Sequence, residues 1–254
     1  MLIDTHAHIY LEDFKNDRDE VIKRAVSAGV NRVFLPNIDN ATVVPLLDVC
    51  KKYPGTCFPL MGLHPCSVKE NYREELAEVE KNLAGGKFYG VGEIGLDFYW
   101  DKTFINEQVD AFKIQCDVAK RYSLPVIIHS RASLHKIIEI LEALHDPSIF
   151  GIFHCFPGTY EDAARILSLG NFKFGIGGVI TYKNSALPDV VRKIGIEHIV
   201  LETDSPYLTP VPYRGKRNES AYLVLVINKV AEVLNMPVDE VARITTKNGD
   251  DIFG

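Results

Sequence analysis

The chain has 254 residues, of which 46% are hydrophobic and 24% are charged, a balance typical of a globular protein with a sizeable core. Its formal net charge of -6 excludes a broad electrostatic attraction for nucleic acid or anionic membranes, so any polyanionic substrate has to be bound locally. The five cysteines are scattered, odd in number and without a C-x-x-C pair, which favours a reduced, cytoplasmic setting over a disulfide or zinc-knuckle protein.

No stretch of about 18 consecutive apolar residues occurs in the sequence. The N-terminus leads directly into an apolar segment, without the basic residues that begin a secretory signal. We therefore expect neither membrane insertion nor secretion, and the sequence gives no sign of an obligate protein partner.

The first part of the chain alternates short apolar segments with segments of helical spacing. Residues 1–3 have the character of a buried strand, and the helix expected at 18–29 ends at Gly29. The other elements expected up to residue 93 are strands at 32–36, 57–61 and 88–93 and helices at 41–52 and 71–83.

The alternation continues to the C-terminus. Val109, Phe112, Cys116 and Ala119 are spaced as on one face of a helix, and the strand expected at 125–129 is almost entirely aliphatic, as in a buried parallel sheet. The remaining expected elements are strands at 149–154, 172–176 and 198–202 and helices at 134–144, 160–169, 187–194, 223–234 and 238–246.

Eight strand–helix alternations without a flexible linker predict an α/β fold, a single (β/α)8 TIM barrel that forms one domain over residues 1–254. An open, doubly wound sheet is the alternative. Short strands with polar residues clustered after their C-terminal ends favour the closed barrel, in which catalytic groups lie at those ends.

Side chains of the metal-ligand type lie at or just after the ends of five of the eight expected strands. His6 and His8 are two residues apart, so in extended chain they point to the same side and can chelate one cation. Each such residue alone has an ordinary structural explanation. That explanation is weaker for the whole set, because five strands place a residue of this type at the same rim. The candidate ligands are His6, His8, Glu93, His129, His154 and Asp204.

Six ligands exceed the needs of one tetrahedral ion and suit two divalent cations about 3.5 to 4 Å apart. Glu93 is the candidate bridge, because a carboxylate can offer one oxygen to each cation. His6, His8 and Asp204 would complete one site, since the first and eighth strands are neighbours in a closed barrel. His129 and His154 would complete the other.

The predicted chemistry is hydrolysis by a water whose pKa the cations lower. Asp204 is a candidate acceptor for the proton of this water, so Glu93 and Asp204 are the candidate catalytic residues. Nitrogen-rich ligation fits zinc, manganese or cobalt better than magnesium. Asp4 is expected to support the ligands rather than to bind a cation.

The motifs around these residues resemble those of the TatD family of metal-dependent deoxyribonucleases, in the expected order along the whole chain. They are His6-Ala7-His8, Gly62-Leu63-His64-Pro65, Gly92-Glu93-Ile94-Gly95-Leu96-Asp97, His129-Ser130-Arg131, His154-Cys155-Phe156, Glu202-Thr203-Asp204-Ser205-Pro206-Tyr207-Leu208 and Arg214-Gly215-Lys216-Arg217-Asn218-Glu219. The resemblance implies hydrolysis of DNA phosphodiesters, with exonuclease action on single strands, and the same six metal ligands.

Two positions depart from the family pattern. Pro157 stands where serine or threonine is usual, and Ser220 stands where proline is usual. Both lie outside the ligand set, so they bear on substrate preference more than on hydrolysis.

Candidate substrate contacts are fewer and less specific. His64 follows a strand, Arg131 follows His129, and Arg214 and Lys216 lie in the segment after the last strand, where cations can meet phosphates. Aromatic residues near these motifs can offer faces for unpaired bases, although aromatic side chains more often pack in a core. They are Phe98, Tyr99, Trp100, Phe156, Tyr182 and Tyr207.

Two other functions remain open at this point. The first is another hydrolase of the same barrel type, acting on an amide, a lactone or a phosphotriester; many of these bridge their metals with a modified lysine, where this chain has Glu93. The second is a non-catalytic barrel that binds metal for stability or serves as a scaffold.

Overall fold

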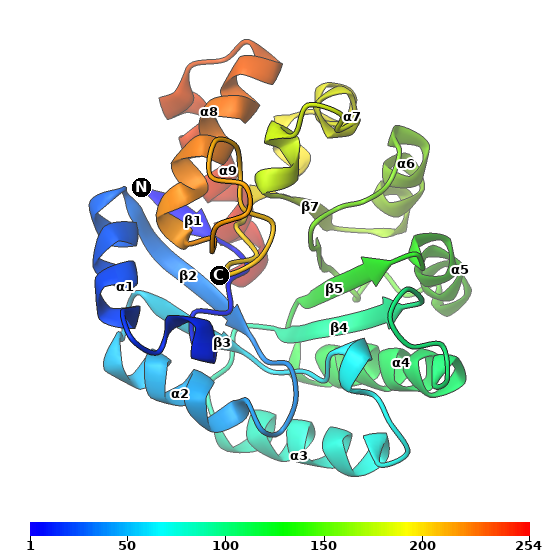
Figure 1. The fold of residues 1–254 in the computed structure, drawn as a ribbon. Coiled ribbons are helices and arrows are strands. Elements are labelled where there is room, and N and C mark those ends of the chain that lie inside the picture. The colour runs from blue at the N-terminus through cyan, green and yellow to red at the C-terminus, as the bar shows by residue number, and fades with distance from the viewer.

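The computed structural model describes residues 1–254 and confirms the predicted TIM barrel: in Figure 1 the helices surround a ring of parallel strands. The strands are β1 (Leu2–Asp4), β2 (Val30–Pro36), β3 (Cys57–Leu60), β4 (Val91–Asp97), β5 (Val126–Arg131), β6 (Gly151–Phe153), β7 (Phe172–Ile176) and β8 (Ile199–Leu201). The helices are α1 (Arg18–Ser27), α2 (Val43–Lys52), α3 (Tyr72–Gly85), α4 (Ile105–Tyr122), α5 (Leu134–Leu144), α6 (Tyr160–Leu169), α7 (Leu187–Ile194), α8 (Leu223–Leu234) and α9 (Val238–Phe253).

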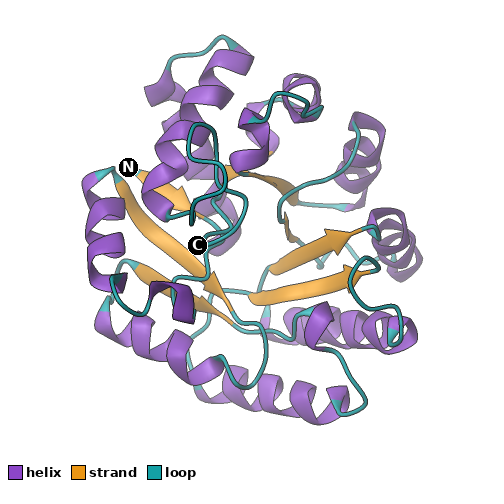
Figure 2. Cartoon of the chain, in the orientation of Figure 1, coloured by secondary structure: helices purple, strands orange, loops and turns teal.

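The strand ladders form two parallel sheets, β1-β2-β3 and β4-β5-β6-β7-β8. Figure 2 shows the strands inside the ring of helices. Backbone hydrogen bonds join the two sheets at both seams. Between β3 and β4, the amide of Gly92 donates to the carbonyl of Met61 at 3.1 Å. Between β8 and β1, Thr5 donates to Leu201 at 3.0 Å and Asp204 donates to His6 at 2.9 Å. The barrel is therefore closed.

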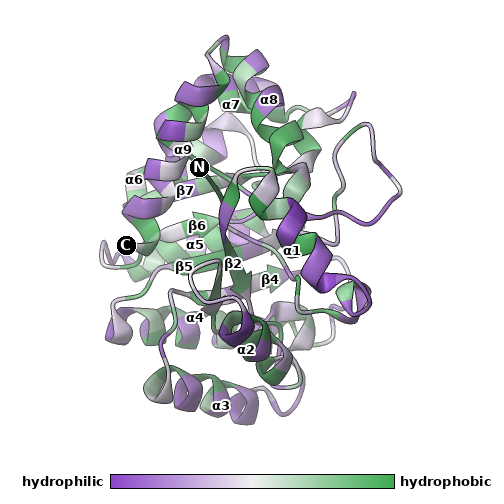
Figure 3. Cartoon of the chain, turned by 90° about the vertical axis from the view of Figure 1, so that its left-hand side faces the viewer, coloured by the Kyte–Doolittle hydropathy of each residue, from purple (hydrophilic) through white to green (hydrophobic).

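One end of the barrel is filled by apolar side chains. Ile3, Ile127 and Val200 from three strands form a cluster with Ile252 and Phe253 at the end of α9, and the ring of Phe253 stacks on Phe34 of β2 at 3.7 Å. A larger cluster of 60 buried residues lies between the strands and the helices. Figure 3 shows this pattern, with hydrophobic residues on the strands and on the helix faces turned toward them.

Most elements differ from the prediction by one to three residues at an end, and two differ by more. The fourth strand begins at Val91 and continues to Asp97, because residues that read as a glycine-rich loop pair with β5. The last helix runs to Phe253 instead of residue 246, through a segment that has the composition of a turn. Gly249 lets the end of α9 pack closely against β1, because a Cβ at this position would lie only 3.0 Å from the Cδ1 of Ile3.

None of the helices combines the length and the hydropathy that a membrane-spanning helix needs. Only Ser220–Leu234 and Val238–Phe253 taken together reach that length and hydropathy, and the chain bends by 108° between them.

Candidate metal centre

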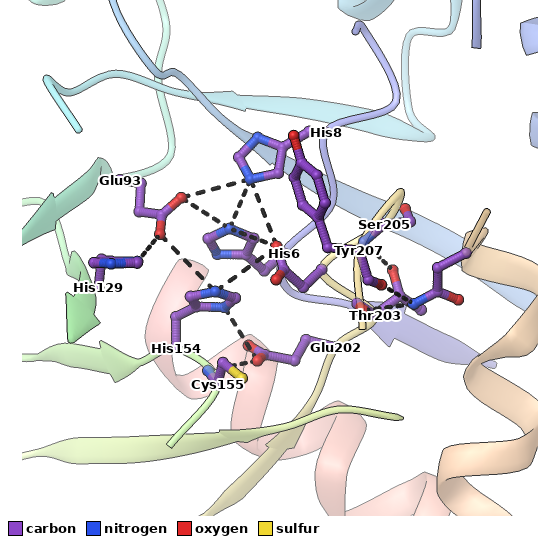
Figure 4. Close-up of polar contacts among 12 residues, drawn as sticks. His6, His8, Glu93, His129, His154, Cys155, Glu202, Thr203, Ser205 and Tyr207 are labelled. Carbon is purple, nitrogen blue, oxygen red and sulfur yellow. Dashed lines mark hydrogen bonds and ion pairs between the residues drawn. The ribbon is translucent and has the colours of Figure 1, made fainter. Parts of the chain in front are cut away.

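The structure brings the six candidate ligands together at the C-terminal ends of the strands, and all of them except Asp204 are labelled in Figure 4. Glu93 and His129 lie within β4 and β5, and the other four follow the ends of β1, β6 and β8. All of them are buried or partly buried. Their convergence from five strands explains why the set is spread over 199 residues of sequence, from His6 to Asp204.

Four donor atoms from these residues form one compact group. The Nε2 atoms of His6 and His8 are 3.1 Å apart, and they lie 3.2 and 3.5 Å from the Oε2 of Glu93. The Oδ1 of Asp204 is 3.9 Å from His6 Nε2 and 3.7 Å from His8 Nε2. Tetrahedral ligands at about 2.1 Å from a cation are themselves about 3.4 Å apart, so this group has the dimensions of one coordination shell.

The other oxygen of Glu93 faces a second group of imidazoles. Its Oε1 is 2.9 Å from His129 Nδ1, 3.5 Å from His64 Nε2 and 3.9 Å from His154 Nε2. His154 lies between the two groups, since its Nε2 is also 3.8 Å from the Oδ1 of Asp204. The two oxygens of one carboxylate therefore point to two sets of donors, an arrangement that fits a pair of divalent cations.

Tyr10 fixes the orientation of His8. The hydroxyl of Tyr10 donates to the carbonyl of Pro36 at 2.6 Å, which leaves its oxygen to accept from His8 Nδ1 at 3.0 Å. The proton of the ring is thus on Nδ1, and the lone pair of Nε2 points to the other ligands. The sequence analysis missed this role of Tyr10, although its spacing of two from His8 puts it on the same side.

Glu202 supports His154 in the same way. Its Oε1 is 3.1 Å from His154 Nδ1, on the far side of the ring from Glu93, and it also accepts the Cys155 amide at 2.6 Å. Burial alone would lower the pKa of His154, but the carboxylates of Glu202 and Asp204 outweigh it and raise this pKa to about 10. The carboxylate of Glu202 thus keeps a proton on Nδ1, and Nε2, which faces the ligand group, is the nitrogen that would give up its proton to a cation.

Asp97 supports His129 from the side of the ring opposite Glu93. Its Oδ2 is 2.9 Å from His129 Nε2, and its Oδ1 accepts the amides of Tyr99 at 2.9 Å and Trp100 at 3.1 Å. Burial opposes ionisation of Asp97, but the hydrogen bonds from His129 and from these amides outweigh it and lower its pKa. One carboxylate thus holds both a candidate ligand and the loop after β4.

Asp4 lies behind the ligands, as expected, and acts on the backbone. Its Oδ1 accepts the amide of Thr203 at 2.9 Å and that of His6 at 3.3 Å, and its Oδ2 accepts the hydroxyl of Thr203 at 2.6 Å. Burial raises the pKa of Asp4 to about 7. Asp4 therefore ties the end of β1 to the segment after β8, where Asp204 lies.

His64 differs from the other imidazoles in its hydrogen bonding. Its Nδ1 accepts the amide N–H of Cys66 at 3.1 Å, so in the neutral ring the proton is on Nε2. Burial lowers the pKa of His64, which keeps the ring neutral. His64 consequently presents an N–H donor to the site rather than a lone pair, and this suits a bound oxyanion better than a cation.

The charges of the site also fit cation binding. Burial alone would raise the pKa of Glu93, but its electrostatic interactions with the His6 and His64 imidazoles and the hydrogen bond from His129 outweigh burial and hold this pKa well below its usual value. Burial lowers the pKa of His6 strongly, so its ring is neutral and can act as a ligand. The donor set of imidazoles and carboxylates is the one that zinc and similar divalent cations prefer.

A cavity of about 770 Å³ opens above these residues. Arg131 and His64 line it, together with Trp100, Tyr207 and the aliphatic side chain of Leu208. The volume is that of a site for a small molecule or for one or two units of a polymer.

The remaining candidate contacts lie outside the cavity lining. The guanidinium of Arg214 is stacked on the ring of Tyr182 at 3.9 Å, and Lys216 lies 5.7 Å from the ring of Tyr213. Both are exposed on the segment after β8. The neighbouring Arg217 is used structurally, since it forms two hydrogen bonds with Asp17.

The aromatic candidates differ in exposure. Phe156 is buried and packs on Phe174 at 4.5 Å. Tyr99, Trp100 and Tyr207 are exposed large side chains. Of the two departures from the family pattern, Pro157 lines the cavity, whereas Ser220 is buried and its hydroxyl has no hydrogen-bond partner.

Comparison with known proteins agrees with this geometry. The family model described as TatD related DNase matches residues 3–254. The uncharacterized metal-dependent hydrolase YabD of Bacillus subtilis is 37% identical over 100% of this chain and 99% of its own length. The uncharacterized metal-dependent hydrolase YjjV of Escherichia coli is 32% identical over 99% of this chain and 97% of its own length.

Solved structures give the same result. The crystal structure of YjjV, a TatD homologue from Escherichia coli, superimposes with a TM-score of 0.93 at 30% identity and covers 99% of this chain and 97% of that chain. An uncharacterized amidohydrolase from Saccharomyces cerevisiae shares the fold, with a TM-score of 0.87 at 19% identity over 99% of both chains. The chain therefore belongs to the TatD-related DNase family of metal-dependent hydrolases.

Proposed function

We propose that this protein hydrolyses phosphodiester bonds of DNA, acting as an exonuclease on single-stranded ends with two divalent cations. The observation that supports this most is the position of Glu93, whose Oε2 lies 3.2 Å from His6 Nε2 and whose Oε1 lies 2.9 Å from His129 Nδ1. A carboxylate between two donor groups is the arrangement expected of a two-metal phosphodiesterase.

His6, His8, Asp204 and one oxygen of Glu93 would hold the first cation. The other oxygen of Glu93, with His129 and His154, would hold the second. When bound, such cations polarise a phosphodiester and lower the pKa of a water molecule. Zinc, manganese or cobalt suits the nitrogen-rich donors better than magnesium does.

The protein groups around the cations have separate tasks. Asp204, whose side chain is 15% exposed at the cavity floor, receives the proton of the attacking water. His64 donates its Nε2–H to a phosphate oxygen, and Arg131 adds a positive charge at the edge of the cavity. Arg214 and Lys216 contact phosphates further along the strand.

The family description also supports DNA as the substrate. The alternative is an amide, lactone or phosphotriester hydrolase of the same barrel type. No lysine lines the cavity, so a modified lysine is not available as a bridge, whereas the two oxygens of Glu93 face both donor groups. A polyanionic substrate also gives a use to Arg131 and His64 that a neutral amide does not.

The test uses protein stripped with a chelator and then supplied with one cation at a time. We expect cation-dependent shortening of end-labelled single-stranded DNA, slower shortening of duplex DNA, and little activity on amides, lactones and phosphotriesters. Glu93→Ala and His154→Ala should abolish the activity while remaining folded, and His135→Ala, at a side chain 74% exposed outside the cavity, should retain it. Digestion by Glu93→Ala at the wild-type rate, or amide hydrolysis without nuclease activity, would contradict the proposal.

A further inference from the structure

Two large aromatic side chains are exposed side by side at the edge of the cavity. The side chain of Tyr99 is 57% exposed and that of Trp100 is 66% exposed. Their ring centroids are 4.9 Å apart with an angle of 85° between the planes. Leaving so much apolar surface in water is unfavourable, and such surface in a soluble protein commonly marks a binding site.

Arg131 covers part of this surface. Its guanidinium lies 4.3 Å from the centre of the Tyr99 ring and 4.9 Å from that of Trp100. A guanidinium stacked on aromatic rings keeps its hydrogen-bond donors free at its edge. Arg131 and Trp100 both line the same cavity as Glu93 and His129. Trp100 and Arg131 therefore belong to the same cavity as the metal centre, and Tyr99 lies beside them.

The loop that carries the two rings is held in a fixed position relative to the metal centre. Asp97 accepts the amides of Tyr99 and Trp100 with one oxygen and lies 2.9 Å from His129 Nε2 with the other. A shift of this loop would disturb His129 as well. The distance between the rings and the reacting phosphate is therefore set by the fold, not by the flexibility of an exposed loop.

We propose that Tyr99, Trp100 and Arg131 form a subsite for one unpaired nucleobase of the strand whose phosphodiester lies at the metal centre. The base stacks on the open part of the Trp100 ring, and Arg131 contacts the adjoining phosphate. Stacking on an aromatic side chain contributes about 1–3 kcal/mol per base and does not depend on sequence. Bases in a duplex are stacked on their neighbours, so this subsite selects single strands.

The inference rests on the proposed nuclease function, but it can be tested by binding alone. Trp100 is the only tryptophan in the chain, so the intrinsic tryptophan fluorescence of the protein reports on this subsite. The probe is a short phosphorothioate oligothymidylate, which resists hydrolysis, titrated into protein supplied with Zn²⁺. We expect this strand to quench the fluorescence. An abasic strand of equal length and a blunt duplex should not quench it, and both should bind more weakly.

Substitutions separate stacking from general binding, with affinity measured by anisotropy of a labelled strand. Trp100→Ala should weaken binding by roughly 5- to 150-fold, the equivalent of one stacked base, and Trp100→Phe should restore most of it. The control is Tyr53→Ala. Tyr53 is also an aromatic residue near a cation, since the Nζ of Lys52 lies 5.5 Å from its ring. It follows the C-terminal end of α2 and does not line the cavity.

The outcomes distinguish the subsite from the nuclease activity. Quenching that requires bases, together with weaker binding by Trp100→Ala, supports the subsite even if no cation gives hydrolysis. Equal affinity of Trp100→Ala and wild type, or equal binding of abasic and normal strands, overturns the subsite even if DNA is hydrolysed.

Discussion

Three imidazoles of the site each have a protein group behind them. Tyr10 accepts from His8, Glu202 faces the Nδ1 of His154, and an oxygen of Asp97 lies 2.9 Å from His129 Nε2. Such partners set which nitrogen carries the proton and so determine which atom can bind a cation. The affinity for cations therefore depends on residues that do not touch them.

Glu202→Gln tests this dependence. The substitution keeps the shape of the side chain but removes the charge that faces His154 Nδ1, so we expect the affinity for the cation to fall by about 10- to 100-fold. Isothermal titration with zinc measures it. Glu197→Gln, at an exposed glutamate close in sequence, should bind as tightly as wild type. Equal affinities for the two variants would rule out the role assigned to Glu202.

His64→Ala separates substrate binding from cation binding. Its Nε2–H is available to an oxyanion, and a hydrogen bond to a charged group contributes about 1.5–3 kcal/mol, so kcat/KM on single-stranded DNA should fall by roughly 10- to 150-fold. Elemental analysis should find the same number of cations per chain as in wild type. Loss of a cation from the variant would instead identify His64 as a ligand.

Much of this residue-scale picture could be predicted from the sequence. The six side chains that the structure brings together were predicted because each ends or follows an expected strand, and strand ends of a barrel meet at one rim. Tyr10 and Glu202 were missed, because their roles depend on contacts with other strands: Tyr10 donates to Pro36 of β2, and Glu202 lies beside His154, which follows β6. A signal was present: Glu202 is two residues from Asp204, and Tyr10 is two from His8, so each pair shares a side of the extended chain.

At the scale of elements, strand β7 has a glycine, Gly175, at the point where the side chain of Glu202 lies against it, and Glu202 is the residue beside His154. A Cβ on Gly175 would lie 2.1 Å from the Oε2 of Glu202, so any larger residue would push this carboxylate out of place. The backbone of Gly175 is not in the left-handed region, so its conformation does not require glycine. The requirement comes from the lack of space for a side chain.

Gly175→Ala should therefore weaken cation binding and also lower stability by about 1–3 kcal/mol, as overpacking does in other cores. Gly177→Ala is the matched control, because a Cβ there would be at an ordinary contact distance of 3.4 Å from the Glu202 carbonyl. Thermal unfolding in chelator and zinc titration of both variants give the two quantities. The idea fails if both variants behave alike.

The limits of prediction at this scale are also specific. Periodicity located every strand and helix of the barrel, but β4 and α9 extend further than expected. Each contains glycines that read as loop residues in isolation. Pairing with β5 and packing against Ile3 override this local preference, and neither contact is visible in a local sequence pattern.

At the scale of the whole molecule, the candidate ligands connect the two sheets. His6 and His8 follow a strand of the three-stranded sheet, whereas Glu93, His129 and His154 come from the five-stranded sheet. Cations bound among them would link the sheets in addition to the backbone hydrogen bonds of the seams, and they would bind only the folded barrel.

Removal of the cations should therefore lower the thermal midpoint of unfolding. A cation at about 100 times its Kd stabilises a protein by about 2.7 kcal/mol. For a chain of this size this corresponds to a shift of roughly 5–10 °C. Calorimetry with and without chelator measures the shift for wild type. Glu93→Ala should show a much smaller one, and a full shift in that variant would place the stabilising cation elsewhere.

The seam between β8 and β1 has a consequence for synthesis of the protein. Asp204 bonds to the backbone of His6 there, and the amide of His8 donates to Ser205, although these residues are nearly 200 positions apart in the chain. On the ribosome, His6 and His8 are synthesised early, whereas Asp204 is added only when most of the 254 residues have been made. A nascent chain thus carries an incomplete group of candidate ligands, and a product released before Asp204 would lack one of the six.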